Sequence, residues 1–393
     1  MKYKTLGLVC GLLAILGSAT FTPAATGQGL VKEQPASGRF VKTDQGFMVP
    51  YKFIIPGTEA VVHMAPIPGG VVRVGSPESE SGRKKVEGPQ FDVVVEPFWM
   101  AAYETSWAEY KEFMNLYESF KEFETRGVRA VTDENRVDAI TAPTELYDPS
   151  YTFDMGEHPR QPAITMTQYA AKQYTKWVTN VTGGIQFRLP SEAEWEHACR
   201  AGAETAYHFG DSPGKLSQYA WYGDNSNDTT QQVGKKKPNP WGLYDMHGNV
   251  SEWVLDELLK DGYTRFHGKR LTAAEAVVWP TKLFPRVVKG GSWDDEASSL
   301  RAAARLGSHD YDWKEDDPNI PLSPWWYTSD PAGGVGFRMI RPLKTTPKRE
   351  FAKFWDVDCA EMRDDVTIRL EEGRGVIGLV DPDLPKALKE LEK

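Results

Sequence analysis

The sequence has few side chains that could hold a redox metal. Its 393 residues include three cysteines and seven scattered histidines, which gives no support for an independent iron or zinc centre. Cys10 lies in an apolar N-terminal run, and the preceding Val9 is not the small residue expected before a lipidated cysteine. If that run is removed, only Cys199 and Cys359 remain, too few for a disulfide framework.

The chain also lacks an excess of positive charge. Its 46 lysines and arginines face 55 aspartates and glutamates, a net charge of -9. Nucleic acid is therefore not expected as a partner, because phosphate binding requires a basic face. A composition of 40% hydrophobic and 26% charged residues fits a globular protein, and 13 tryptophans with 35 glycines predict aromatic packing interrupted by many turns.

No apolar run is long enough to span a bilayer comfortably, which takes about 20 residues. Residues 1–27 instead have the layout of a secretory signal: Lys2 and Lys4, then an apolar run from Leu6 to about Ile15, then small residues. We therefore expect a signal peptide that is cleaved, an exported protein in the periplasm or outside the cell, and no transmembrane segment in the mature chain.

The remaining sequence divides into three parts. Residues 28–59 are interpreted as a linker, residues 60–342 as the folded domain, and residues 343–393 as a C-terminal extension outside the core. Polar residues 128–162 form a long loop that is either functional or an insertion.

Two capping boxes mark helix starts within the domain. Ser106 with Glu109 precedes aromatic residues at helical spacing over 107–120, and Ser191 with Glu194 begins a second helix. Cys199 lies on one face of that second helix and is interpreted as a small core hydrophobe.

A series of motifs follows in a consistent order: "IPGG", "RLPSEAEWEHACRAG", "NPWGLYDMHGNVSEW", "KGGSWDD", "RAAARLG" and "GFRMIRP". Over residues 60–342 this series resembles the formylglycine-generating enzyme family, also called sulfatase-modifying factors. The resemblance implies an irregular α+β fold of the C-type-lectin kind, low in regular secondary structure and stabilised by calcium. The H-x-x-x-H-x-E pattern of the iron-binding domain in related sulfoxide synthases is absent.

The resemblance also implies a calcium site. It falls on Asp245, Gly248, Val250 and Glu252, with two side chains and two main-chain carbonyls as ligands. Calcium prefers six to eight oxygen ligands, and a glycine-containing turn can direct carbonyls inward. Without the resemblance, Asp245 would be interpreted as a turn residue and Glu252 as a surface acid.

The family's other calcium site has a weaker match. It would fall near Trp221 and Tyr222, but a tryptophan stands where the family places an asparagine. This site is left unassigned, with Asp224 and Asp228 as candidates.

The "KGGSWDD" turn lacks the sulfur of active family members. They carry two cysteines after the GGS motif that bind Cu(I) and oxidise a substrate cysteine, and the matching positions here are Asp295 and Leu300. Cu(I) is a soft ion that selects thiolate or thioether ligands. Copper is therefore not expected, and formylglycine-generating activity is not expected either.

The acids of the turn have two interpretations. Asp294, Asp295 and Glu296 could bind a hard metal or act as acid and base if burial raises one pKa. More often such a run is a solvated loop, and Arg301 and Arg305 offer ion-pair partners that would explain the acids without catalysis.

Asn249 and Ser292 match family positions near the substrate groove, and either could instead satisfy local backbone groups. With Asp295 they are the candidate catalytic residues. The favoured hypothesis is a family member without copper chemistry that binds a ligand or protein partner in this groove. The alternatives are a formylglycine-generating oxidase that converts a sulfatase cysteine, and a structural module of a cell-envelope assembly.

Overall fold

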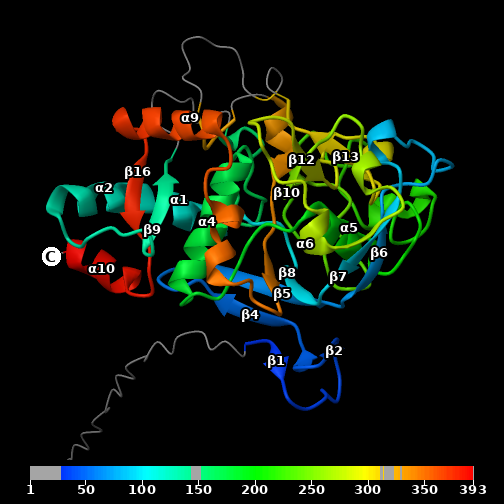
Figure 1. The fold of residues 1–393 in the computed structure, drawn as a ribbon, viewed down its shortest axis with the longest axis horizontal. Helices are drawn as coiled ribbons and strands as arrows, with labels where there is room; N and C mark the ends of the chain where they lie inside the picture. The colour runs from blue at the N-terminus through cyan, green and yellow to red at the C-terminus, as the bar shows by residue number, and fades with distance from the viewer. Residues whose placement is uncertain (1–27, 143–151, 310–312, 314–322, 328–329, 393) are drawn as a thin grey trace, which may run out of the picture.

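The structure is a computed structural model that describes residues 28–142, 152–309, 313, 323–327 and 330–392. It is a mixture of short strands, short helices and long turns (Figure 1). The strands are β1 (Leu30–Val31), β2 (Val41–Thr43), β3 (Gly46–Met48), β4 (Tyr51–Ile54), β5 (Val61–Ile67), β6 (Gly70–Val74), β7 (Phe91–Val95), β8 (Phe98–Ala101), β9 (Arg136–Ile140), β10 (Ser251–Glu257), β11 (Arg270–Thr272), β12 (Arg286–Lys289), β13 (Arg305–Gly307), β14 (Val335–Gly336), β15 (Ile340–Pro342) and β16 (Val376–Leu379). The helices are α1 (Trp107–Met114), α2 (Leu116–Arg126), α4 (Gln168–Val181), α5 (Glu192–Arg200), α6 (Ala273–Ala276), α8 (Ala352–Trp355), α9 (Ala360–Glu371) and α10 (Leu384–Leu391).

The strands form several small sheets. Two four-stranded sheets have the orders β13-β12-β10-β14 and β15-β8-β5-β4, and β11-β7-β6 forms a three-stranded sheet. In the first sheet β10 lies between antiparallel β12 and parallel β14, with Trp253 opposite Val288. Every residue of β10 is buried, so this strand carries side chains of the interior.

The helices begin where the capping boxes predict. The Ser191 hydroxyl accepts a hydrogen bond from the Glu194 amide at 3.3 Å, and the Glu194 carboxylate accepts one from the Ser191 amide at 2.8 Å. The aromatic helix predicted over 107–120 is instead two helices, because Asn115 ends α1 and begins α2. Its aromatic face still packs in the core, as predicted.

Residues 28–59 are not an unstructured linker. β4 pairs antiparallel with β5 and so extends a sheet of the domain. Met48, Phe53 and Ile55 are buried in the largest hydrophobic cluster. Burial of the apolar side chains around Phe53 lowers the free energy of the folded chain, which explains why this segment joins the core.

The C-terminal extension is also part of the core, contrary to the interpretation from sequence. β16 pairs with β9, and α10 lies against α2 (Figure 1). Trp355, Val376 and Leu384 belong to the same hydrophobic cluster as Trp177 of α4. These apolar residues are widely spaced along a charged sequence, so the sequence does not show that they form one buried face.

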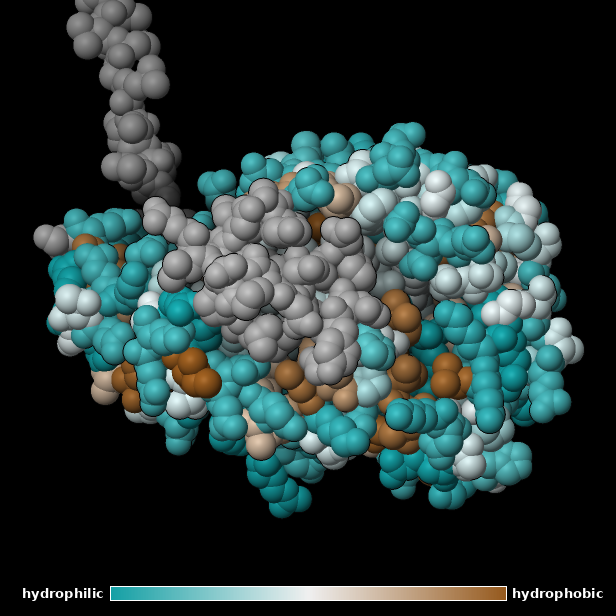
Figure 2. Space-filling model, turned by 90° about the horizontal axis from the view of Figure 1, so that it is seen from above, coloured by the Kyte–Doolittle hydropathy of each residue, from teal (hydrophilic) through white to brown (hydrophobic). Residues whose placement is uncertain are grey.

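No helix among the described residues is long and apolar enough to cross a membrane. The predicted signal at residues 1–27 lies outside the described residues, and so does part of the long loop, residues 143–151. The face seen in Figure 2 is mainly hydrophilic, with its hydrophobic residues in small separate groups.

Candidate functional site at the glycine turn and the acidic cluster

The glycine turn begins where β12 ends. Gly290 and Gly291 have positive φ angles of 100° and 70°, a region that favours glycine. A Cβ on Gly291 would lie 2.8 Å from Cδ1 of Leu300, so the turn packs directly over this leucine. The backbone of the turn therefore depends on what occupies position 300.

Leu300, which the motif match places at the second family cysteine position, is fully buried. It belongs to a small apolar cluster whose other members are Ala206, Tyr207, Leu216 and Ala220. Its side chain would also lie 3.1 Å from a Cβ placed on Gly248. Position 300 thus contributes packing, and it offers no metal ligand.

Asp295 stands at the first cysteine position and bonds within its own turn. Its Oδ2 accepts hydrogen bonds from the Ser292 amide and hydroxyl, both at 2.8 Å. The cavity beside it, which Ser251 and Arg301 also line, has a volume of about 40 Å³. Such a volume suits a few water molecules but not an organic ligand.

Asn249 is fully buried, and both ends of its amide have partners. Its Oδ1 accepts a hydrogen bond from the Gln231 amide at 2.8 Å. Its Nδ2 donates to Glu104 Oε2 at 2.9 Å and to the Gln231 carbonyl at 3.1 Å. Asn249 therefore supports the local backbone at Gln231 and contacts Glu104.

The predicted ion pairs within the 294–305 segment are wrong. Arg301 binds Glu87 at 2.7 Å, and Arg305 binds Glu192 at 2.5 Å. Asp294 and Glu296 are exposed. The arginines pair with distant acids because β13 and the preceding turn carry both guanidinium groups into the interior, away from the acidic loop.

Four charged residues near the turn form a buried group, here called the acidic cluster: Glu104, Asp245, Glu252 and Arg338. Arg338 donates to both oxygens of Glu252 at 2.6 and 2.7 Å, and the Trp195 indole donates to Glu252 Oε2 at 2.8 Å. Glu104 follows β8 and reaches the cluster from the opposite sheet. Three carboxylates thus share one guanidinium.

This imbalance shifts the acids toward their protonated forms. Burial, followed by the charges of Asp245 and Glu252, raises the pKa of Glu104 well above its ordinary value. Burial, with a further contribution from Glu252, raises the pKa of Asp245 to about 6. Arg338 opposes both shifts but compensates only one negative charge. The cluster can therefore accept a proton or a cation.

Asp245 has one carboxylate oxygen without a partner, whereas the Glu252 side chain is already committed to Arg338. Asp245 Oδ2 accepts a hydrogen bond from the Gly234 amide at 2.7 Å, and the buried Oδ1 has no hydrogen-bond partner. Gly248 has a φ of 138°, and the Val250 amide donates to Glu104 Oε1 at 3.2 Å. Among the described residues, no three histidine, cysteine, aspartate or glutamate side chains are arranged to hold a metal ion.

The region around Trp221, where the resemblance places the family's other calcium site, contains the positively charged Lys236. Lys236 Nζ lies 3.6 Å from the centre of the Trp221 ring, and Asp224 and Asp228 are exposed. The ammonium group thus occupies the surroundings of the residue that replaces the family asparagine.

Sequence reasoning missed Glu104 and Arg338. An acid two residues after the buried run "FWMAA" was a usable signal, because a charge rarely follows buried residues into the interior without a partner. Cys199 was interpreted correctly as a core residue. It is fully buried, its thiol donates to the Met246 carbonyl at 3.5 Å, and burial raises its pKa above the ordinary value.

Comparison with known proteins identifies the family. Residues 55–316 match the family model of the sulfatase-modifying factor enzyme 1-like domain. The chain is 29% identical over 268 residues to the formylglycine-generating enzyme of Mus musculus, covering 61% of this chain and 68% of that one. It is 27% identical over 279 residues to the serine/threonine-protein kinase pkn1 of Chlamydia pneumoniae, covering 71% of this chain but only 39% of the kinase.

A solved structure supports the same assignment. PvdO from Pseudomonas aeruginosa superposes with a TM-score of 0.51 at 26% identity, covering 74% of this chain and 98% of PvdO. The predicted α+β fold and the predicted family are both confirmed. The chain belongs to the family of sulfatase-modifying factor proteins that includes the formylglycine-generating enzymes.

Proposed function

We propose that this chain is an exported family member that does not make formylglycine with copper and that binds a protein partner through the surface around the glycine turn. The observation that carries the proposal is the burial of Leu300 at a position where active members place a thiol. Since an isobutyl group ligates nothing and Asp295 is a hard ligand, the turn does not fit Cu(I).

Neither remaining cysteine replaces the missing pair. Cys199 is fully buried and Cys359 is 8% exposed, and burial raises the pKa of both thiols. A thiolate is the form that binds copper, and these thiols resist ionisation. Cys359 also lies in the extension, next to Arg286 at 3.7 Å.

A protein partner fits the turn better than a small ligand does. The cavity beside Asp295 is too small for an organic molecule, whereas Asp294 and Glu296 project into solvent. Exposed acids of this kind can contact a basic segment that lies across the surface.

Calcium is part of the proposal as a structural ion. It would bind the partnerless oxygen of Asp245 with main-chain carbonyls of Gly248 and Val250, and it would offset the surplus negative charge of the acidic cluster. Copper is not part of the proposal.

The test is an activity assay with copper, oxygen and a sulfatase-derived cysteine peptide, with an active formylglycine-generating enzyme as the positive control. We expect no aldehyde product and no tight Cu(I) binding. Aldehyde formed by this chain would overturn the proposal and favour the oxidase.

Export has a separate test. The chain expressed with residues 1–27 should be recovered outside the cytoplasm with an N-terminus near residue 28. Retention of the whole sequence in the cytoplasm would contradict this part.

A further inference from the structure

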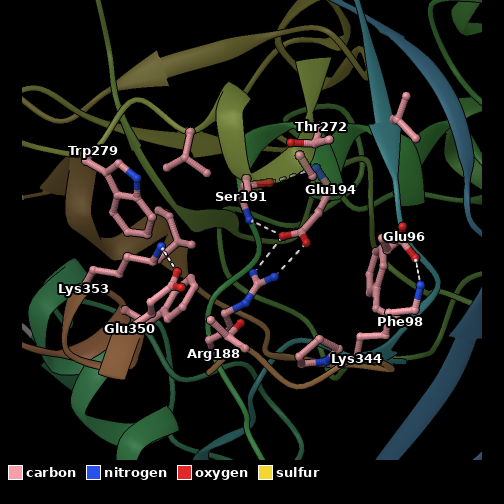
Figure 3. A pocket seen from close by; sticks show the side chains of 18 of the residues that line it. Glu96, Phe98, Arg188, Ser191, Glu194, Thr272, Trp279, Lys344, Glu350 and Lys353 are labelled. Atoms are coloured by element: carbon pink, nitrogen blue, oxygen red, sulfur yellow. Dashed lines mark hydrogen bonds and ion pairs between the residues drawn. The ribbon is translucent and has the colours of Figure 1, made fainter. Parts of the chain in front are cut away.

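A larger cavity, with a volume of about 220 Å³, lies between the domain and the C-terminal extension. In Figure 3, Trp279, Glu350 and Lys353 lie on one side of this cavity and Glu96 and Phe98 on the other, with Arg188 between them. It is distinct from the glycine turn, because none of the residues lining it belongs to 289–305.

The extension completes this cavity. Lys344, Glu350, Lys353 and Phe354 all line it and all lie beyond residue 316, where the family match ends. The site therefore depends on a part of this chain that the family model does not describe.

The walls of the cavity are apolar and aromatic. Phe98 and Leu255 line it together with Trp279 and Phe354, whose rings meet edge to face with centroids 5.5 Å apart. A cavity of about 150 Å³ in another protein holds benzene. A volume of about 220 Å³ therefore accommodates one aromatic ring with a short substituent.

One buried donor in the wall lacks a partner. Arg188 is 8% exposed, and its two terminal nitrogens donate to Glu194 at 2.8 Å each. Its Nε has no hydrogen-bond partner. This nitrogen is buried from the cavity as well as from solvent, and the guanidinium lies 5.0 Å from the centre of the Phe354 ring, so Arg188 closes the wall and offers no free donor to a ligand.

The rim offers charges of both signs. Lys353 Nζ binds Glu350 at 2.8 Å and lies 5.5 Å from the centre of the Trp279 ring. Both members of this pair are partly exposed, so their mutual attraction is weak and each can exchange its partner for a ligand group. Because the positive Lys353 and the negative Glu350 are adjacent, they match a ligand that carries both a negative and a positive group.

We propose that this cavity binds a small aromatic amino acid. Its ring packs against the apolar wall that includes Trp279 and Phe354, its carboxylate binds the Lys353 ammonium, and its own ammonium group binds Glu350.

The test compares phenylalanine with three analogues that each lack one feature: phenethylamine lacks the carboxylate, 3-phenylpropionate lacks the ammonium, and alanine lacks the ring. Binding is measured by calorimetry and by the fluorine resonance of Trp279 in the 5-fluorotryptophan-labelled full chain, assigned with Trp279→Phe. We expect phenylalanine to bind with a dissociation constant on the order of 1 mM or below, and each analogue to bind at least about fivefold more weakly.

Variants locate the binding. Ala273→Leu places a larger side chain in the wall and should abolish binding, whereas Ala360→Leu at the exposed first residue of α9 should not change it. Lys353→Met should reduce the affinity for phenylalanine about threefold to fivefold and leave that for phenethylamine unchanged. Glu350→Gln should likewise reduce the affinity for phenylalanine and leave that for 3-phenylpropionate unchanged. Lys348→Met is the control, because Lys348 is exposed and lies outside the cavity.

Three outcomes would overturn the proposal. They are no saturable binding at about 10 mM phenylalanine, equal binding of phenylalanine and its two singly charged analogues, or binding that a folded Ala273→Leu variant retains. If Ala273→Leu fails to fold, as judged by circular dichroism, the Lys353→Met and Glu350→Gln pair decides the question.

Discussion

The protein has two buried groups of charged residues near β10, and their negative charges are compensated to different degrees. In the acidic cluster, three carboxylates share Arg338. In a second group, here called the paired network, each acid contacts two bases; its members are Glu192, Glu196, Arg200, Lys289 and Arg305.

Glu196 shows what pairing achieves. Arg200 lies 2.8 Å from one of its oxygens and Lys289 lies 3.3 Å from the other. Although burial opposes the charge, these cations hold the pKa of Glu196 below its ordinary value. Asp245, equally buried but without a cation in contact, has its pKa raised to about 6. Contact with cations therefore keeps a buried carboxylate such as Glu196 charged, whereas burial without such contact favours the protonated form of Asp245.

The largest effect should come from removing the only guanidinium of the acidic cluster. Arg338→Met should cost about 3–5 kcal/mol, because it leaves Glu252 buried and uncompensated. Lys289→Met should cost less, since Arg200 and Arg305 remain in the paired network. Urea unfolding measures both, and equal losses would show that the two clusters do not differ as described.

The next largest effect should be that of Asp245 on how the free energy of unfolding depends on pH in the absence of calcium. The raised pKa of Asp245 means that its protonated form stabilises the fold below about pH 4, and that this contribution is lost as the pH rises to about 6. Unfolding free energies between pH 4 and 7 should fall less steeply for Asp245→Asn than for the original chain.

Asp256, whose pKa is raised to about 7 by burial and by Glu192, adds a slope of the same sign in both proteins. The difference between them therefore reports Asp245 together with the part of the raised Glu104 pKa that the Asp245 charge causes, and identical slopes would contradict the assignment of Asp245. Glu196→Gln is the opposite case, because the lowered pKa of Glu196 stabilises the fold above its ordinary pKa and this stabilisation disappears in acid.

Calcium should have a somewhat smaller effect. An ion that binds only the folded state, at a hundredfold excess over its dissociation constant, stabilises by about 2.7 kcal/mol. We expect calcium to raise the melting temperature of the original chain and of Glu196→Gln, but not of Asp245→Asn. Metal analysis should find calcium without copper or iron. If calcium does not change the melting temperature of the original chain, the calcium site is contradicted, and protons rather than calcium would offset the charge of the acidic cluster.

The smallest effect should come from the turn itself. Ser292→Ala removes one hydrogen bond to Asp295 and should cost about 1 kcal/mol. Because Asp295 belongs to neither cluster, the variant should keep the pH dependence and calcium response of the original chain. A changed calcium response would connect the turn to the acidic cluster.

The sequence by itself determined the features that depend on neighbouring residues. Ser191 and Glu194 marked the start of α5 because a capping box closes within one turn, and the motif series identified the family. The replacement of both thiols by Asp295 and Leu300 was also visible, since it requires only an aligned motif. Asp245 was found only through the resemblance, because a turn acid has no distinctive local pattern.

The tertiary structure decided which distant groups meet. Arg301 pairs with Glu87 rather than with the acids beside it in sequence, and Glu104 joins Asp245 from another sheet. The burial of the extension and the cavity that it completes depend on the same long-range contacts. An ion pair or a buried face is set by the three-dimensional path of the chain, because electrostatic and packing energies depend on distance in space and not on separation in sequence.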